Sequence, residues 1–252
     1  MPLVKGITIS KFFGGLKALQ DVDIVINKNE LLGLIGPNGA GKSTLINVLS
    51  GYYKPTKGRI LLDGVDVTGK NMHYAARKGL VRSFQQAAIF KELSVFENVI
   101  VAQHIFDRPG IFDEIILSHR RRQKKFEIKA EEFLDFSEMS HLKSVKAGDL
   151  PYGYQKILGV TMAISANPKV LLLDEPVTGM SIGEIKQILD LVVRIKKEKK
   201  LSVLCIEHNV RALLEIVDRV MVLNFGEKIA DGTPEEISND QKVIDAYLGG
   251  GY

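Results

Sequence analysis

The stretch GPNGAGKS, from Gly36 to Ser43, limits what this chain can fold into more than any other feature. It matches the pattern G-x-x-x-x-G-K-[ST], in which glycines let backbone N–H groups surround a phosphate, the lysine reaches the outer phosphates and the hydroxyl ligates Mg²⁺. An apolar run, LLGLIG, leads into the loop, and KSTLINVLSG, of helical composition, follows it and ends at Gly51. This context favours a nucleotide-phosphate loop over a plain glycine-rich turn. The residues expected to hold the nucleotide are Gly36, Pro37, Asn38, Gly39, Ala40, Gly41, Lys42, Ser43 and Thr44, with Ser43 also on the metal.

Two acids end a later apolar run, VLLLDEP. Asp174 is placed to hold Mg²⁺ through water, and Glu175 beyond it could act as general base on an attacking water. Acids at a strand end often only cap the next turn, so this pair by itself is a weak signal. The phosphate loop in the same chain makes the catalytic interpretation the stronger one.

The second half of the chain carries the pattern of a parallel sheet. KVLLLDE, LSVLCIE and RVMVLNF are continuous apolar strands, and between the first two lies a predicted helix that opens on a capping box of Ser181 and Glu184. Apolar strands alternating with a helix indicate a parallel sheet covered on both faces. The fold class expected is therefore α/β, a P-loop NTPase with a RecA-like parallel core.

Two further parts are expected beside this core. Short strands fill the first third of the chain, with Asp63-Gly64 as a hairpin signal, and predict an antiparallel β subdomain. Residues 94–166 have helical character, beginning with a capping box of Ser94 and Glu97, and predict an inserted helical subdomain. The core and β subdomain would then comprise 1–93 and 167–235, and 236–252 would form a C-terminal helix and tail, in a single domain over 1–252. Thr233 with Pro234 and Glu236 marks the start of the last helix.

The composition of the chain places only broad limits on its location and its partners. The net charge of +4 permits contact with an acidic membrane surface or nucleic acid without arguing for either. No apolar run reaches the ~20 residues that a membrane-spanning helix needs, and the N-terminus lacks a secretory signal pattern, so a cytoplasmic protein is expected. The single cysteine, Cys205, excludes an internal disulfide and is expected to be a buried structural thiol. The basic run HRRRQKK at 119–125 is read as a solvated helix face, with contact to lipid headgroups or a partner left open.

With phosphate loop, acid pair and strand order in place, the chain resembles the nucleotide-binding subunit of an ABC transporter over nearly its whole length. Within that family it is most similar to the ATP-binding subunit of branched-chain amino acid importers, in the segments FGGLKAL, FKELSVFENV, EPVTGM, IEHNV and GTPEEISNDQKVIDAYLG. The resemblance implies ATP and Mg²⁺ as ligands and ATP hydrolysis as the activity.

The resemblance also assigns roles to residues outside the phosphate loop. Phe13 matches the aromatic that stacks on adenine, although adjacent Phe12 is a rival and a plain core aromatic is an alternative. Gln85 matches the glutamine that senses Mg²⁺ and the lytic water, with Gln86 one residue away. His208 matches the histidine that contacts the γ-phosphate. The expected catalytic residues are therefore Glu175, His208 and Gln85, and the expected metal residues are Ser43, Gln85 and Asp174.

The stretch LPYGYQK departs from the LSGGQ-type signature that the family uses against the partner subunit's ATP. The matching positions are Leu150, Pro151, Tyr152, Gly153 and Tyr154. Pro151 replaces a serine and Tyr154 a glutamine, which puts two contacts to that ATP in doubt. A helix N-terminus attracts phosphate through its free N–H groups whatever the side chains, so we expect a loss of rate rather than of activity.

The resemblance further implies a head-to-tail dimer with a second ABC ATPase subunit, identical or not. It implies membrane permease subunits as partners, an extracytoplasmic substrate-binding protein indirectly, no nucleic acid, and a peripheral place on the inner face of the cell membrane. A lipid or polysaccharide exporter and a non-transport ABC ATPase acting on ribosomes or DNA remain the alternatives. In the family's scheme the transported substrate does not contact this subunit.

Overall fold

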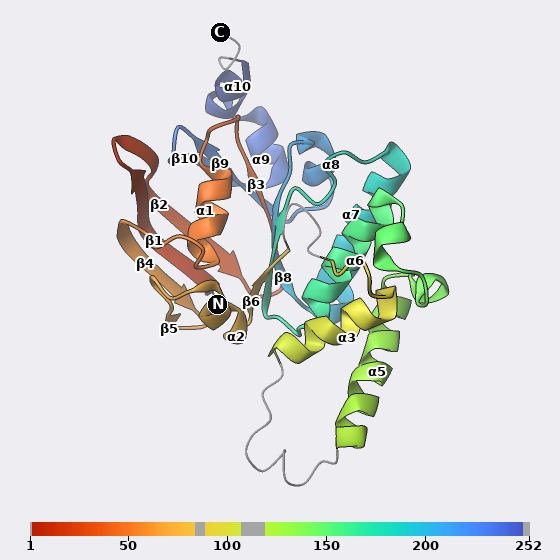
Figure 1. The fold of residues 1–252 in the computed structure, drawn as a ribbon. Helices are drawn as coiled ribbons and strands as arrows, with labels where there is room; N and C mark the ends of the chain where they lie inside the picture. Colours follow the sequence, from red (N-terminus) through yellow and green to blue (C-terminus); the bar gives the residue numbers. More distant parts are fainter. Residues whose placement is uncertain (1, 84–88, 107–118, 249–252) are drawn as a thin grey trace.

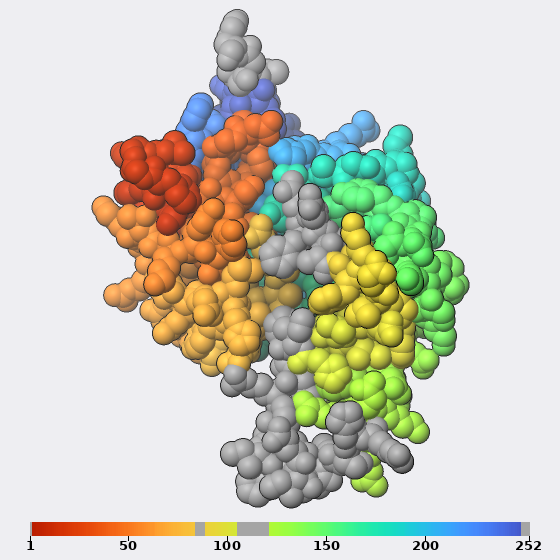
Figure 2. All heavy atoms as spheres, viewed as in Figure 1, coloured from red at the N-terminus to blue at the C-terminus, as the bar shows by residue number. Residues whose placement is uncertain are grey.

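The computed structural model describes residues 2–83, 89–106 and 119–248. Two sheets and a group of helices make up this part of the chain. Figure 1 shows the antiparallel sheet and helix α1 (Lys42–Leu49) on one side of the molecule and helices α3 (Val95–Phe106), α5 (His119–Phe136), α6 (Tyr152–Ser165) and α7 (Ile182–Lys199) on the other. The parallel strands lie between these two groups. In Figure 2 the yellow and green residues of the helical insertion and the red and orange residues of the first strands occupy opposite sides of the molecule.

The first sheet has four strands in the order β2-β1-β4-β5, and every described pairing in it is antiparallel. Its strands are β1 (Pro2–Phe13), β2 (Leu16–Asn27), β4 (Lys57–Leu62) and β5 (Val65–Asp66). The predicted hairpin is confirmed: Leu62 pairs with Val65, and Asp63 and Gly64 between them have φ values of 50° and 79°. Positive φ at both central positions gives the turn the twist that two antiparallel strands require.

The second sheet has six strands in the order β10-β9-β3-β8-β7-β6. They are β3 (Leu31–Ile35), β6 (Leu80–Arg82), β7 (Val170–Asp174), β8 (Ser202–Ile206), β9 (Arg219–Asn224) and β10 (Glu227–Gly232). All their pairings are parallel except that of β10 with β9. The expected α/β class, a parallel core with an antiparallel β subdomain and inserted helices, is confirmed.

The core lies on both faces of the parallel sheet. Every residue of β3, β7 and β8 is buried, and successive residues face opposite layers. Leu31 belongs to the layer beneath the inserted helices and α7, whereas Leu32 belongs to the layer that contains α1 and the antiparallel sheet. Cys205 on β8 is fully buried, as predicted. Continuous apolar strands are therefore explained by two covered faces.

The helices begin where the sequence signals indicated. The three capping boxes form, with Ser94, Ser181 and Thr233 donating their backbone N–H to Glu97, Glu184 and Glu236 at 2.7, 2.9 and 2.7 Å. The α-helices are α1 (Lys42–Leu49), α2 (Met72–Arg77), α3 (Val95–Phe106), α5 (His119–Phe136), α6 (Tyr152–Ser165), α7 (Ile182–Lys199), α8 (Val210–Leu214), α9 (Pro234–Asn239) and α10 (Gln241–Leu248). Two short 3₁₀ turns, Ser140–Leu142 and Ala147–Asp149, join α5 to α6.

Helices α3, α5 and α6 lie within the stretch 94–166 that was predicted to be a helical insertion. The charged helix α5 is amphipathic: Phe126, Leu134 and Phe136 are buried in the core. The last described residues form two helices rather than one, because the backbone turns to an extended conformation at Asp240 between α9 and α10. Among the described residues, no helix combines the length and apolar character needed to cross a bilayer.

Candidate nucleotide-binding site

The phosphate loop connects the end of β3 to the start of α1, as its sequence context predicted. Gly36 and Gly41 have φ values of 151° and 102°, and neither position has room for a side chain. A Cβ at Gly36 would lie 2.1 Å from the carbonyl oxygen of Leu223, and one at Gly41 would lie 2.7 Å from that of Ala18. The loop can therefore curl at the helix N-terminus, where free N–H groups and the helix dipole favour an anion.

Lys42 is folded into the loop. Its Nζ donates to the carbonyl oxygens of Gly36 at 2.7 Å and Pro37 at 2.9 Å. Burial lowers the pKa of Lys42, while the carboxylates of Glu175 and Asp174 oppose that change. The amine thus lies inside the loop and within the field of both acids, where it can exchange its backbone partners for phosphate oxygens.

Asp174, the last residue of β7, is buried and ion-paired. Nη2 of Arg82, at the end of the neighbouring strand β6, lies 2.6 Å from Asp174 Oδ2. Arg82 also donates to Asn47 on α1 through Nη1. Sequence reasoning missed Arg82, because nothing in the local sequence connects it with a carboxylate 92 residues away.

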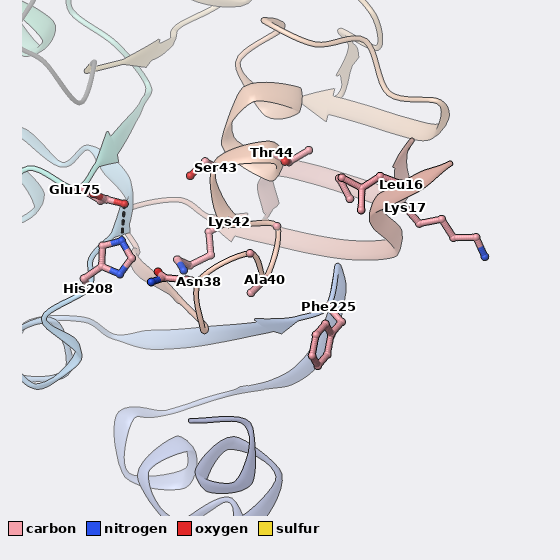
Figure 3. Close-up of a pocket in the computed structure, with 13 residues that line it drawn as sticks. Leu16, Lys17, Asn38, Ala40, Lys42, Ser43, Thr44, Glu175, His208 and Phe225 are labelled. Atoms are coloured by element: carbon pink, nitrogen blue, oxygen red, sulfur yellow. Dashed lines mark ion pairs between the residues drawn. The ribbon is translucent and has the colours of Figure 1, made fainter. Parts of the chain in front are cut away.

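Glu175 and His208 come together at the ends of two adjacent strands. Asp174 pairs with Ile206 in the parallel ladder of β7 and β8, so the residues that follow both strands meet at one edge of the sheet. His208 Nε2 lies 2.8 Å from Glu175 Oε1, as the dashed line in Figure 3 marks, and Thr178 Oγ1 donates to Glu175 Oε2 at 3.2 Å. Glu175 has a φ of 51°, a left-handed conformation that is strained for a residue with a side chain. Its backbone N–H donates to Ile206 at 3.0 Å, which helps to hold that conformation.

These groups share one cavity. A space of about 390 Å³ is lined by the phosphate loop from Asn38 to Thr44, by Glu175 and His208, and by Leu16, Lys17, Ala18 and Phe225. Figure 3 shows Glu175, His208 and Lys42 at one end and Leu16 and Phe225 at the other. A carboxylate that can take a proton from water, a histidine held against it and a phosphate loop are the parts needed for phosphoryl transfer to water.

The exposed apolar side chains at this cavity were not predicted. Leu16 is 67% and Phe225 83% exposed, and both line the cavity. Phe225, with a φ of 46°, sits in the turn between β9 and β10. No short-range sequence signal links that turn to the phosphate loop.

A second cavity, of about 730 Å³, lies between the loop and the last described helix, α10. It is lined by residues 36–40, His208, Asn224, Phe225 and residues 245–247. Burial raises the pKa of Tyr247 on α10, and a hydrogen bond with the backbone of Gly36 opposes that rise. The last described helix is therefore a neighbour of the phosphate loop.

Phe13 does not line either cavity. Its ring is 40% exposed and packs edge-on against Tyr53 with the centroids 5.2 Å apart, and Lys11 Nζ lies 4.9 Å from the ring centroid. Its nearest chain neighbours at the cavity are Leu16, Lys17 and Ala18, and its adenine role stays a prediction. Gln85 and Gln86 both lie outside the described residues.

The chemistry of the donor set fits Mg²⁺. The hydroxyl of Ser43 lies at the cavity and the carboxylate of Asp174 is at the end of β7, and a hard cation prefers such oxygen ligands. Among residues 2–83, 89–106 and 119–248, no cluster of three or more His, Cys, Asp and Glu side chains could hold a metal ion by itself.

The variant signature lies away from this cavity. Pro151 is the N-cap of α6, and none of residues 150–154 lines either space beside the phosphate loop. Tyr152 is half exposed, whereas the ring of Tyr154 packs within the helical part against His141, with centroids 6.1 Å apart. The predicted role of this stretch at another subunit's ATP remains a prediction.

Comparison with known proteins gives one consistent result. The family model described as "ABC transporter" matches residues 19–178, and that described as "Branched-chain amino acid ATP-binding cassette transporter" matches residues 227–252. The chain is 37% identical over 248 residues to the high-affinity branched-chain amino acid transport ATP-binding protein BraF of Pseudomonas aeruginosa, covering 98% of this chain and 96% of that protein. It is 38% identical over 239 residues to the protein of the same description named LivG from Escherichia coli, covering 94% of each.

Solved structures agree with this. A nucleotide-free ATP-binding cassette from an ABC transporter superposes with a TM-score of 0.85 at 34% identity, over 98% of this chain and 99% of that one. The ADP conformation of MJ1267, also an ATP-binding cassette of an ABC transporter, gives 0.86 at 33% identity over 99% of both chains. With a phosphate loop, a Glu175–His208 pair and this likeness over nearly its full length, the chain belongs to the family of ATP-binding cassettes, the ATPase subunits of ABC transporters.

Proposed function

We propose that this chain is the ATP-hydrolysing subunit of an importer for branched-chain or other hydrophobic amino acids. The substrate class is supported by the descriptions of the relatives and by the match of residues 227–252 to a branched-chain transporter family. The observation that carries the enzymatic part is the 2.8 Å contact between Glu175 and His208 on the wall of the phosphate-loop cavity.

Each residue of the site has a separate role in the proposed reaction. The loop N–H groups and Lys42 bind the phosphates, and Lys42 gives up the carbonyl oxygens of Gly36 and Pro37 to do so. Glu175 accepts a proton from the attacking water, and His208, released from Glu175, contacts the γ-phosphate. Mg²⁺, held by Ser43 and Asp174 with Gln85 beside it, would neutralise charge on the phosphate oxygens. Phe13 is proposed to stack on adenine.

Asp174 is held by Arg82 in this structure, which bears on how the metal is taken up. The ion pair holds a buried carboxylate in one orientation, from which it can accept a metal-bound water without a change of backbone. The same holds for Glu175, whose orientation is set by three different bonds before ATP arrives.

The remaining partners follow from this proposal. Two ATPase subunits, identical or not, would close head to tail on ATP, with residues 150–154 of each meeting the nucleotide of the other. Permease subunits in the cell membrane would hold the dimer at its inner face, and an extracytoplasmic binding protein would act through them. Product release would reopen the dimer. Residues 94–166 are proposed as the subdomain that transmits this motion.

Glu175→Gln tests the proposal most directly. The amide keeps the hydrogen bonds but cannot take the proton, so we expect ATP turnover to fall about 10²- to 10⁴-fold with the fold and ATP binding retained. Turnover by the purified chain, with and without a sister ATPase subunit, is the measurement. A folded dimer that turns over ATP no faster than the variant would overturn the proposal, and recovery with ribosomes instead of membranes would exclude transport.

A further inference from the structure

The first turns of α6 and α7 touch each other, although the two helices belong to different parts of the chain. α6 lies in the helical insertion and carries the signature positions, whereas α7 follows the catalytic strand β7. At the contact, Gly153 faces the side chain of Glu184. A Cβ on Gly153 would lie 2.4 Å from Glu184 Oε1 and 2.8 Å from its Cδ, so the carboxylate occupies the place of a side chain at position 153.

The start of α6 lacks a capping acceptor of its own, which this carboxylate can supply. Its N-cap residue is Pro151, which makes no side-chain capping bond, and the first bond within the helix runs from the N–H of Gln155 to Pro151 at 3.1 Å. The N–H groups before Gln155 therefore have no acceptor within the helix. One of them, that of Gly153, lies beside the carboxylate of Glu184 and contributes to lowering the pKa of that carboxylate. A negative charge at this end also suits the helix dipole.

The same carboxylate caps the second helix. Glu184 Oε2 accepts from the Ser181 hydroxyl at 2.6 Å and from the Ser181 backbone N–H at 2.9 Å. The two bonds from Ser181, and after them the bond from Gly153, hold the pKa of Glu184 below its usual range. One side chain thus accepts both donors of Ser181 at the start of α7 and lies against Gly153 at the start of α6.

A second contact joins the same two segments. Gly179, in the turn between Glu175 and Ser181, has a φ of 80°, and a Cβ there would lie 3.6 Å from Cε1 of Tyr152. Tyr152 is 50% and Ile182 88% exposed, so an apolar side chain stands out at the start of each helix. The two starts form one continuous surface.

We propose that Glu184 is a positioning residue that fixes the start of α6 to the start of α7, and thereby shapes the surface that this chain offers to the ATP of a second ATPase subunit. The inference rests on the proposed head-to-tail function. Glu184 need not touch the nucleotide; it acts by keeping the Gly153 end of α6 in register with the segment that follows Glu175. The capping carboxylate at the start of α6, which Pro151 cannot provide, comes from α7.

Hydrogen exchange tests the bridge without any nucleotide. In the ¹⁵N-glycine-labelled chain, the amide of Gly153 should be protected, and Glu184→Ala should speed its exchange by about tenfold or more, since the acceptor is gone. Glu184→Gln, which keeps an acceptor oxygen, should restore most of the protection. The matched control is Glu97→Ala, which removes the same kind of capping carboxylate from α3 and should leave the Gly153 amide unchanged.

A mixed dimer tests the positioning. One copy carries Glu175→Gln, so the remaining turnover arises at the phosphate loop of the other copy. The start of α6 that faces the ATP at that loop belongs to the Glu175→Gln copy. Glu184→Ala on that same copy should lower the remaining turnover about tenfold, the effect of losing one hydrogen bond to a charged group. On the opposite copy it should have a much smaller effect, and Glu184→Gln should rescue.

The results of the mixed-dimer and hydrogen-exchange experiments test the positioning role separately from the proposed function. Equal losses in both placements would show general damage and overturn the positioning role, as would unchanged turnover in both. A wild-type chain that hydrolyses no ATP, alone or paired, would instead overturn the proposed function, and Gly153 exchange would then decide the bridge by itself. An unprotected Gly153 amide in the wild-type chain would refute the bridge.

Discussion

Glu207 is a buried carboxylate that the proposed reaction does not use, and its ionisation should make the stability of this protein depend on pH. It is 3% exposed, directly before His208, and its Oε1 accepts from the N–H of Val177 at 2.8 Å. Burial raises the pKa of Glu207 to about 7; the backbone bonds from Val177 and His208 oppose the rise, the charge of Glu175 adds to it and that of Lys156 opposes it.

The direction and magnitude of this pH dependence follow from the difference between the folded and unfolded pKa of Glu207. Because the folded pKa lies above the unfolded one, the favourable contribution of Glu207 is complete below pH 4.5 and is lost as the pH rises through 7. A change from 4.5 to about 7, at 1.36 kcal/mol for each pKa unit, corresponds to about 3 kcal/mol. Glu207→Gln cannot ionise, so the free energy of unfolding of the variant should lack this decline.

The assay is urea denaturation of wild type and Glu207→Gln from pH 5 to 8.5. The difference between their free energies of unfolding should shift by about 2 to 3 kcal/mol in favour of the variant across that range. Glu97→Gln is the control with the opposite sign, because bonds from Ser94 lower the pKa of Glu97 and its contribution is lost only as the pH falls. If the wild-type and Glu207→Gln curves remain parallel over the whole range, the reasoning about Glu207 is wrong.

Three further predictions follow from the site. Arg82→Ala should destabilise the protein by about 3 to 5 kcal/mol in urea denaturation, because it leaves its carboxylate partner buried without that charge. Gly36→Ala should abolish binding of a fluorescent ATP analogue, since its Cβ would lie 2.1 Å from a backbone oxygen. If Phe13 stacks on adenine, Phe13→Ala should weaken the binding of ATP more than that of inorganic triphosphate. If the exposed ring of Phe225 at the cavity stacks on adenine instead, Phe225→Ala should have this effect.

Controls separate these effects from general damage. Lys143→Ala removes an exposed ion pair and should cost no more than about 1 kcal/mol. Gly39→Ala has open space at its Cβ, so it should impair ATP binding less than Gly36→Ala. An Arg82→Ala protein as stable as the Lys143→Ala one would contradict the importance of the buried pair. Equal losses for ATP and triphosphate in both phenylalanine variants would exclude a base-stacking role for either ring.

Some features of this protein could be read from the sequence because they depend on residues a few positions apart. The curve of the phosphate loop requires glycine at positions 36 and 41, and the hairpin at Asp63 requires two residues that tolerate positive φ. The capping boxes at Ser94, Ser181 and Thr233 each join residues three positions apart. Local hydrogen bonds and backbone sterics decide such features, and they act before any tertiary contact forms.

Other features were decided only by the tertiary structure. The bond between Glu175 and His208 exists because β7 and β8 are neighbours in register, and the pair of Arg82 and Asp174 because β6 lies beside β7. Motif matching named His208 but could not give the contact, and it gave no hint of Arg82. The order of strands in a sheet depends on packing among residues far apart in the chain, which no local pattern encodes.

In the signature stretch, some features are set by the local sequence and others by the tertiary structure. The sequence determined that α6 begins with a proline that cannot cap it and with a glycine at position 153. Only the folded chain shows that Glu184, on another helix, fills the space beside that glycine. A missing cap leaves an unsatisfied donor whose partner can come from any segment, so the sequence reveals the need and the tertiary structure supplies the group that meets it.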